Sequence, residues 1–221
     1  MGQRAYSFGR FIGRVIAFQT MRITVLHAER FDQPGGFVVA CTHLSHLEPA
    51  ILSGLMRRRI DWMARIEFYK YRLSKLLLNA FDAFPVNRFG VPVKAIRTAI
   101  ERTRAGKAVG IFPEGGVVHG DESVMLGGKI KLGACVVSIR AGVPIVPVVV
   151  LGTRQLVRIG PWVPPRRAKL WIIFGEPIYP SAEAVSRREA RLEMGDRLTH
   201  AFRSLYHELR DVCNVPPEHC P

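Results

Sequence analysis

The chain of 221 residues lacks several features that would assign its class at once. Its four cysteines are scattered and form no Cys-x-x-Cys pair, so we expect reduced thiols, no disulfide framework and no metal site. No apolar run approaches the roughly 18 residues that a transmembrane helix needs. The first twenty residues spread their arginines, whereas a signal peptide clusters positive charge ahead of an apolar run. The sequence therefore predicts a protein that is neither secreted nor membrane-spanning.

Acidic residues are scarce as well. The 18 Asp and Glu residues stand against 32 Lys and Arg residues, which gives a formal net charge of +14. Much of the basic surplus gathers in residues 57–75 and 154–169. Such a surplus suits an anionic partner. Composition alone leaves open nucleic acid, acidic lipid, a phosphorylated small molecule and an acidic carrier protein.

Apolar strand patterns alternate with helical patterns from residue 36 onward, which indicates an α/β fold. We expect strands at 37–41, 60–64, 84–86, 108–112, 145–151 and 170–174, and helices at 49–56, 69–79, 93–105, 129–140 and 185–210. The sequence predicts a single domain, residues 31–213, with a mixed, mostly parallel sheet covered by helices. Residues 214–221 are expected to form a loose tail.

The N-terminal region, residues 1–30, is set apart by a pattern typical of an amphipathic helix over residues 3–27. Arginines are spaced along it, and one side is apolar. Such a helix can lie in the membrane interface, although a helix packed against its own domain has the same pattern. The apolar side carries Phe8, Phe11, Ile12, Val15 and Phe18.

A histidine and a carboxylate stand five residues apart directly after the first predicted strand. His43 and Glu48 would not share a face of a regular helix, because five residues turn the chain through about 500°. They meet only if the intervening residues form a turn, and Pro49 favours this by disfavouring helical geometry at Glu48. A carboxylate bound to one imidazole nitrogen leaves the other free to act as a base. The alternative is a polar loop in which Thr42 or Ser45 caps the following helix.

Three further segments follow in a recognisable order. Phe84–Arg88 ends in an arginine, Phe112–Gly116 reads Phe-Pro-Glu-Gly-Gly, and Val143–Val148 contains two prolines. In this order and spacing the chain resembles the glycerophospholipid acyltransferase family, which includes the 1-acylglycerol-3-phosphate acyltransferases. The resemblance extends from about residue 37 to residue 178, and it implies an enzyme that needs no cofactor.

The resemblance assigns roles to single positions. It implies that the enzyme moves an acyl group from acyl-coenzyme A or acyl carrier protein to the hydroxyl of a lysophospholipid or similar polar lipid, with 1-acylglycerol-3-phosphate as the default acceptor. It also implies a peripheral protein on the cytoplasmic face of a membrane. The oligomeric state stays open. The implied assignments are His43 as the base, Glu48 as its orienting acid, Arg88, Glu114 and Gly115 in the acceptor site, and Val143, Pro144, Ile145 and Pro147 along the acyl pocket.

Two departures from the family pattern bear on the acceptor. Glu48 replaces the more common aspartate and is one methylene longer. Gly116 and Val117 follow Gly115 where the family frequently has Thr-Arg, so an arginine that would bind phosphate is missing. The nearby cations that could replace it are His119, Lys129 and Lys131, and we expect the two lysines in the acceptor site.

Two other functions are compatible with the sequence. One is a non-catalytic basic module that binds membrane or nucleic acid, and the other is a transacylase that needs no coenzyme A. Residues 69–72 interleave tyrosine with basic residues, but no further stacking platform or nucleic-acid motif occurs, so we expect no nucleic-acid partner. The chain also lacks the Gly-x-Ser-x-Gly, His-Glu-x-x-His and Gly-x-Gly-x-x-Gly signatures of other enzyme classes.

Overall fold

The computed structural model describes residues 21–70, 78, 83–86, 93–159, 168–181 and 186–221. Residues 3–20 of the predicted N-terminal helix lie outside this part of the chain. The same holds for Arg88 and for most of the predicted helix 69–79, of which the structure describes only residues 69–70, at the end of a 3-10 helix (Ile66–Lys70), and residue 78.

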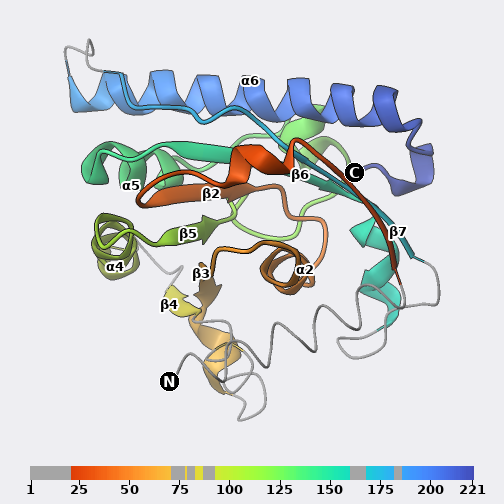
Figure 1. The fold of residues 1–221 in the computed structure, drawn as a ribbon, viewed down its shortest axis with the longest axis horizontal. Helices are drawn as coiled ribbons and strands as arrows, with labels where there is room; N and C mark the ends of the chain where they lie inside the picture. Colours follow the sequence, from red (N-terminus) through yellow and green to blue (C-terminus); the bar gives the residue numbers. More distant parts are fainter. Residues whose placement is uncertain (1–20, 71–77, 79–82, 87–92, 160–167, 182–185) are drawn as a thin grey trace.

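A seven-stranded sheet forms the centre of the molecule (Figure 1). Five strands run parallel to one another, β7 runs antiparallel to β6, and β1 is parallel to β7. The spatial order is β1-β7-β6-β2-β5-β3-β4. The predicted single α/β domain with a mixed, mostly parallel sheet is confirmed. The strands are β1 (Met21–Leu26), β2 (Phe37–Cys41), β3 (Ile60–Arg65), β4 (Phe84–Val86), β5 (Ala108–Ile111), β6 (Ile145–Leu151) and β7 (Ala168–Phe174).

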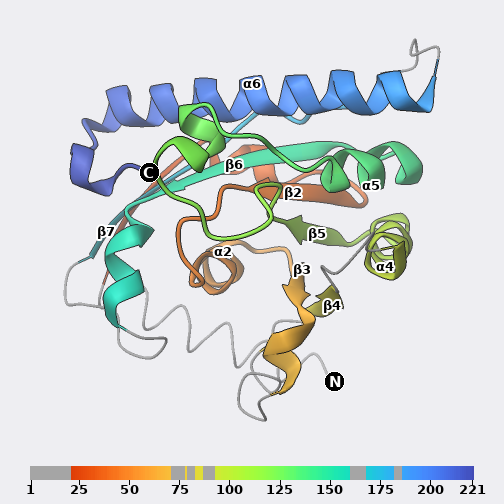
Figure 2. The ribbon, with the colours of Figure 1, turned by 180° about the vertical axis from the view of Figure 1, so that it is seen from behind.

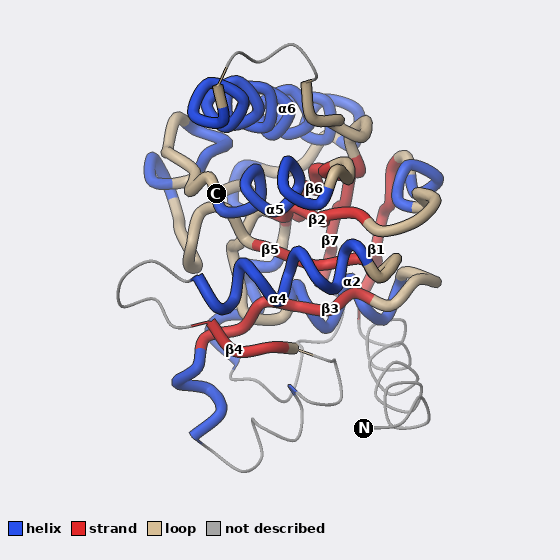
Figure 3. The backbone as a smooth tube through the Cα atoms, turned by 90° about the vertical axis from the view of Figure 1, so that its left-hand side faces the viewer, coloured by secondary structure: helices blue, strands red, loops and turns tan. Residues whose placement is uncertain are grey.

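Helices cover both faces of this sheet. Helices α4 (Val93–Arg104), α5 (Gly133–Ala141) and α6 (Arg187–Cys213) pack on one face; Figure 3 shows α6 end-on and α4 lengthwise. Helix α2 (Glu48–Leu55) packs against the other face. None of the helices within the described residues is both long enough and apolar enough to cross a bilayer.

Strand β2 shows how the two faces are built from one sequence. All five of its residues are buried. Val38 and Ala40 belong to the apolar cluster under α4, α5 and α6, whereas Phe37, Val39 and Cys41 belong to the cluster under α2. A strand buried on both faces needs a continuous apolar run rather than an alternating one, and this is the pattern that predicts it correctly.

The prediction of a helix over residues 3–27 is wrong for its last part, because Met21–Leu26 is the edge strand β1. Its side chains follow a period of two, with Arg22 and Thr24 exposed and Ile23 and Val25 half-buried. The β-branched residues fit the strand, and parallel pairing with β7, far along the chain, decides the outcome. The predicted N-terminal helical region, residues 1–30, therefore includes a strand that belongs to the sheet of the domain.

The segment between β5 and α5 also differs from the prediction. Helix α5 begins at Gly133 rather than at residue 129, and two 3-10 turns, Gly120–Glu122 and Val124–Leu126, precede it. Gly127 has a φ of 119°, which a helix cannot contain. Figure 2 shows this loop passing beside α6, where Arg203 Nε donates to the Val124 carbonyl at 3.3 Å.

Residues 214–221, expected to be a loose tail, lie against the domain instead. Val215 and Cys220 are buried, and Pro217–His219 form a 3-10 turn. The carbonyl of His219 accepts a hydrogen bond from the Gly152 amide at 3.0 Å. The apolar Val215 and Cys220 explain the packing, because burying them removes apolar surface from water.

Candidate active site

His43 and Glu48 meet at the carboxyl end of β2. The turn between them brings His43 Nδ1 to 2.7 Å from Glu48 Oε2, as the sequence predicts, and Glu48 is the first residue of α2. A carboxylate at Nδ1 favours the tautomer with the proton on that nitrogen. Among the residues that the structure describes, Nε2 of His43 has no hydrogen-bond partner. The imidazole therefore has one nitrogen fixed and one free to accept a proton.

The carboxylate of Glu48 is completely buried. Burial raises the pKa of Glu48, and the hydrogen bonds from His43 and Thr153 act against this effect. Thr153 Oγ1 donates to Oε1 at 2.5 Å, and the Leu44 amide donates to the same oxygen at 3.2 Å. Both carboxylate oxygens thus have partners, as a buried charge requires.

The imidazole of His43 lies at one end of a column of stacked aromatic rings. The imidazole stacks on Phe112 with centroids 3.9 Å apart, and Phe112 stacks on Trp62 at 5.1 Å. Trp62 Nε1 donates to Ser53 Oγ at 2.9 Å, which fixes the far end of the column. A Cβ at Gly110 would lie 2.2 Å from the indole, so this position needs glycine. The column leaves the imidazole little freedom to turn.

Glu114, expected in the acceptor site, holds the backbone of the site together. Its Oε2 accepts from the His43 amide at 2.8 Å, and its Oε1 accepts from Ser123 Oγ and the Val124 amide, each at 3.0 Å. The carboxylate thereby joins the dyad to the loop before α5. The Val118 amide also donates to the His43 carbonyl at 3.0 Å.

Lys131 lies directly over Gly115. A Cβ at Gly115 would stand 2.5 Å from Lys131 Nζ, and the φ of Gly115 is 83°, so both the space and the backbone require glycine. The Gly115 amide donates to the Phe112 carbonyl at 3.0 Å and is not free to bind an anion. The ammonium group of Lys131, unlike this amide, has no such backbone partner among the described residues, and it lies next to the turn that carries Glu114 and Gly115. Both lysines expected here are exposed, and Lys131 is the one that lies over Gly115.

Of the predicted acyl-pocket residues, Pro147 pairs with Ala40, one position from the end of β2, and Ile145 lies further from the dyad. Val38 of β2 pairs with Ile145, whereas Cys41, at the end of β2 next to the dyad, pairs with Val148. Three strand positions, about 10 Å, separate the two ends. The acyl-pocket assignment stays a prediction. The four residues are Val143, Pro144, Ile145 and Pro147; the last three are buried, and Ile145 and Pro147 lie in β6.

Sequence reasoning did not find Thr153 or Phe112 as part of the dyad's surroundings. Thr153 follows the last strand position of β6 and reaches Glu48 from 105 residues away. The one available signal is its place two residues after a buried strand in a mostly parallel sheet, where carboxyl ends meet. Phe112 lies directly after β5.

These features define a candidate enzyme site at the carboxyl edge of the sheet, where a carboxylate-bound histidine has one nitrogen free to accept a proton. The family model described as "Acyltransferase" matches residues 22–151, more than half of the chain. The chain belongs to this acyltransferase family and is an acyltransferase, which confirms the resemblance found in its sequence blocks.

Two known proteins are similar to the chain. The 1-acyl-sn-glycerol-3-phosphate acyltransferase of Bacillus subtilis (strain 168) is 28% identical over 189 residues, covering 85% of this chain and 89% of the relative. The crystal structure of the 1-acyl-sn-glycerophosphate acyltransferase from Thermotoga maritima aligns with a TM-score of 0.64 and 21% identity, over 92% of this chain and 79% of that one. The second similarity supports the fold.

Titration of Glu48 is expected to make stability depend on pH in a direction opposite to that of most carboxylates. Its pKa is raised in the folded protein, so the folded state binds the carboxyl proton more tightly than the unfolded chain does. The free energy of unfolding therefore falls as pH rises from about 4.3 through the raised pKa. Glu48→Gln lacks this titration, and its stability relative to wild type should increase across the window.

Urea unfolding of wild type and Glu48→Gln at several pH values above about 4.3 measures this difference. Glu101→Gln, at an exposed position of α4, is the control and should keep a constant difference from wild type. Parallel stability curves for wild type and Glu48→Gln would contradict the prediction.

Proposed function

We propose that the protein is a 1-acylglycerol-3-phosphate O-acyltransferase, which transfers a fatty acyl group from a thioester to the free hydroxyl of a lysophosphatidic acid. The observation that carries the proposal is the buried pair in which Glu48 Oε2 holds Nδ1 of His43 and leaves Nε2 free. Membership of the acyltransferase family and the activity for which both similar proteins are named agree with it.

The reaction follows from the free nitrogen of His43. Nε2 takes the proton of the acceptor hydroxyl as its oxygen attacks the thioester carbonyl, and the new C–O bond gives a tetrahedral oxyanion. Collapse of this intermediate breaks the C–S bond, and the leaving thiolate takes the proton from Nε2. Glu48 stays ionised throughout and stabilises the imidazolium that exists between the two proton transfers. The base is therefore regenerated in each cycle.

Lys131 is the residue we propose for the acceptor phosphate. The family's usual arginine is missing after Gly115, and Lys131 places its ammonium group over that glycine. An ammonium group pairs with a phosphate as a point charge and needs no fixed planar geometry. At this position Lys131 can supply the positive charge that the missing arginine would otherwise provide.

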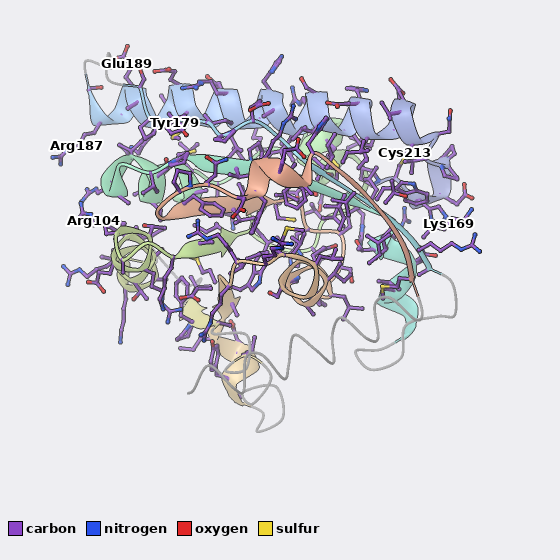
Figure 4. All side chains as sticks on the ribbon, in the orientation of Figure 1. Arg104, Lys169, Tyr179, Arg187, Glu189 and Cys213 are labelled. Atoms are coloured by element: carbon purple, nitrogen blue, oxygen red, sulfur yellow. The ribbon has the colours of Figure 1, made fainter. Side chains whose placement is uncertain are left out.

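The donor and the place of reaction belong to the same proposal. The donor is an acyl thioester of coenzyme A or of acyl carrier protein, and both carry negative charge that suits a chain with a net charge of +14. The reaction takes place at a membrane surface, because a two-tailed product does not leave readily into water. Cations lie on distant parts of the surface, and Figure 4 shows Arg104 and Lys169 pointing outward on opposite sides of the molecule.

Replacing His43 with alanine should abolish acyl transfer while the protein stays folded. Loss of a general base lowers kcat by about 100- to 10,000-fold. The measurement is formation of diacyl lipid from labelled acyl-coenzyme A and a mixed lysolipid extract, read by mass spectrometry, with circular dichroism as the check of folding. Glu48→Gln should lose less, because its amide oxygen still orients the imidazole.

His46→Ala is the matched control for this experiment. His46 is exposed, and its ring centroid lies 5.8 Å from that of His43 in an edge-on arrangement, so its loss should leave most of the rate. A substantial rate in folded His43→Ala would refute the assignment. Absence of any new diacyl lipid with wild type would favour the non-catalytic module, and product without a thioester donor would identify a transacylase.

Replacing Lys131 with methionine should weaken binding of the acceptor without slowing the acyl-transfer step. Loss of one charged contact raises KM for lysophosphatidic acid by about tenfold or more, whereas kcat changes little. A neutral monoacylglycerol, which has no phosphate, should be used equally well by both proteins. Lys129→Met provides the comparison and should change KM less, and an unchanged KM for Lys131→Met would exclude this phosphate contact.

Acyl transfer on membranes should depend on salt. Contacts between basic residues and anionic lipid contribute about 1 kcal/mol each and are screened as salt rises. With lysophosphatidic acid in anionic vesicles, we expect vesicle binding and rate to fall together as salt increases. In neutral detergent micelles the rate should depend less on salt than it does in anionic vesicles. Equal salt dependence in both would contradict an electrostatic membrane contact.

A further inference from the structure

The hydroxyl of Thr153 points at the one carboxylate on which the dyad depends. It donates to Glu48 Oε1 at 2.5 Å, and Thr153 is fully buried. The Leu44 amide donates to the same oxygen at a longer distance of 3.2 Å. With Oε1 occupied in this way, Oε2 is the oxygen left to face His43 Nδ1.

The fold brings Thr153 to this place by the pairing of β6 with β2. Cys41 at the end of β2 lies opposite Val148, so the residues that follow β6 reach the same edge of the sheet as His43. The backbone then turns at Gly152, which has a φ of 85°. A Cβ at Gly152 would lie 2.2 Å from the Lys169 carbonyl oxygen, so the turn requires glycine.

A second contact fixes the turn from the opposite side. The Gly152 amide donates to the His219 carbonyl at 3.0 Å, and the imidazole of His219 packs near Trp171 of β7 with centroids 5.2 Å apart. The backbone that carries Thr153 is therefore held by strand β7 and by the segment after α6. Such support is what a side chain needs in order to hold another group at a fixed distance.

We propose that Thr153 is a positioning residue for acyl transfer, whose hydroxyl fixes the Glu48 carboxylate so that Oε2 stays on Nδ1 of His43. The proposal rests on the proposed role of His43 as the base. Without this hydroxyl the carboxylate can rotate about its last side-chain bond, and the buried charge loses a donor. Thr153 acts through Glu48 and does not itself contact the reacting atoms.

The proposal also explains how this chain uses glutamate where its family more often has aspartate. The additional methylene extends the carboxylate by about one C–C bond, 1.5 Å. At this length Glu48 touches both His43 and Thr153. We expect a shorter acid on the same backbone to lose one of these contacts, so that the length of residue 48 and the hydroxyl at residue 153 form a matched pair.

Thr153→Val tests the hydroxyl with little change of shape. We expect kcat for acyl transfer to fall about tenfold or more, the usual effect of losing a hydrogen bond to a buried charge. KM for the acceptor should stay constant, because Thr153 does not face it. Thr153→Ser keeps the hydroxyl and should retain most of the rate.

The pH profile separates positioning from simple loss of packing. Without the Thr153 donor the pKa of Glu48 rises further, so the acidic limb of kcat should move to higher pH in Thr153→Val and stay in place in Thr153→Ser. The ionisable groups around Glu48 are His43 in direct contact and, further away, Cys41 and Glu114, and none of the variants alters them.

Thr103→Val is the matched control. Thr103 is equally buried, and its hydroxyl donates to the Ala99 carbonyl within α4 at 3.0 Å, away from the dyad. Its loss should affect stability and leave kcat and the pH profile unchanged. The proposal is overturned if Thr153→Val keeps the wild-type kcat and acidic limb, or if Thr153→Ser and Thr153→Val are impaired alike.

A double-mutant cycle tests the matched pair. Glu48→Asp should already lose the contact with Thr153, so adding Thr153→Val to Glu48→Asp should change kcat by much less than Thr153→Val alone does. An equal fold-change in the two backgrounds would mean that the residues act independently, and the pairing would be refuted.

A readout without substrate keeps this test separate from the proposed function. In imidazole-labelled protein, the Nδ1–H proton of His43 should give a protected NMR signal in wild type and Thr153→Ser. In Thr153→Val the signal should shift or broaden. If wild type transfers no acyl group, the proposed function fails, and the NMR comparison still decides whether Thr153 positions the dyad. An identical signal in all three proteins would refute the positioning role.

Discussion

The carboxylate of Glu48 is a buried charge, and the arrangement around it explains why the sheet is built as it is. A charge without contact with water must be compensated by donors, and here these come from the turn after β2 and from Thr153, two residues after β6. The two sources meet because β2 and β6 are parallel neighbours with a fixed register. The central strands therefore serve as the frame that sets the distance between the two ends of one hydrogen-bond network.

A second buried carboxylate holds the same histidine by its backbone. Glu114 binds the His43 amide on one oxygen and the loop before α5 on the other. The side chain and the backbone of His43 are thus fixed by two different acids, one at the start of α2 and one in the turn after β5, and the Phe112 ring packs against the imidazole. A loop fixed in this way also carries Lys131 to its position above Gly115.

Local patterns were sufficient for much of this arrangement. Continuous apolar runs predicted β2 and β6, and Pro49 predicted the turn that joins His43 to Glu48. Contacts between distant segments were not predictable in the same way. Whether Met21–Leu26 is a helix or a strand depends on β7, and the partners of Glu114 lie in a loop whose path is set by Gly127 and by packing against α6.

The order of the strands has a consequence for how the protein reaches its folded state. Strand β2 is made early, yet its two neighbours, β5 and β6, come much later in the chain. Its five apolar residues are all buried in the end, and until those partners are synthesised they have nothing to pair with. Sheets whose strands pair across such long sequence distances fold slowly, and their folding intermediates expose apolar surface and are prone to aggregation. Assembly of this enzyme is accordingly a late, cooperative event, and its yield should depend on temperature and on chaperones during synthesis.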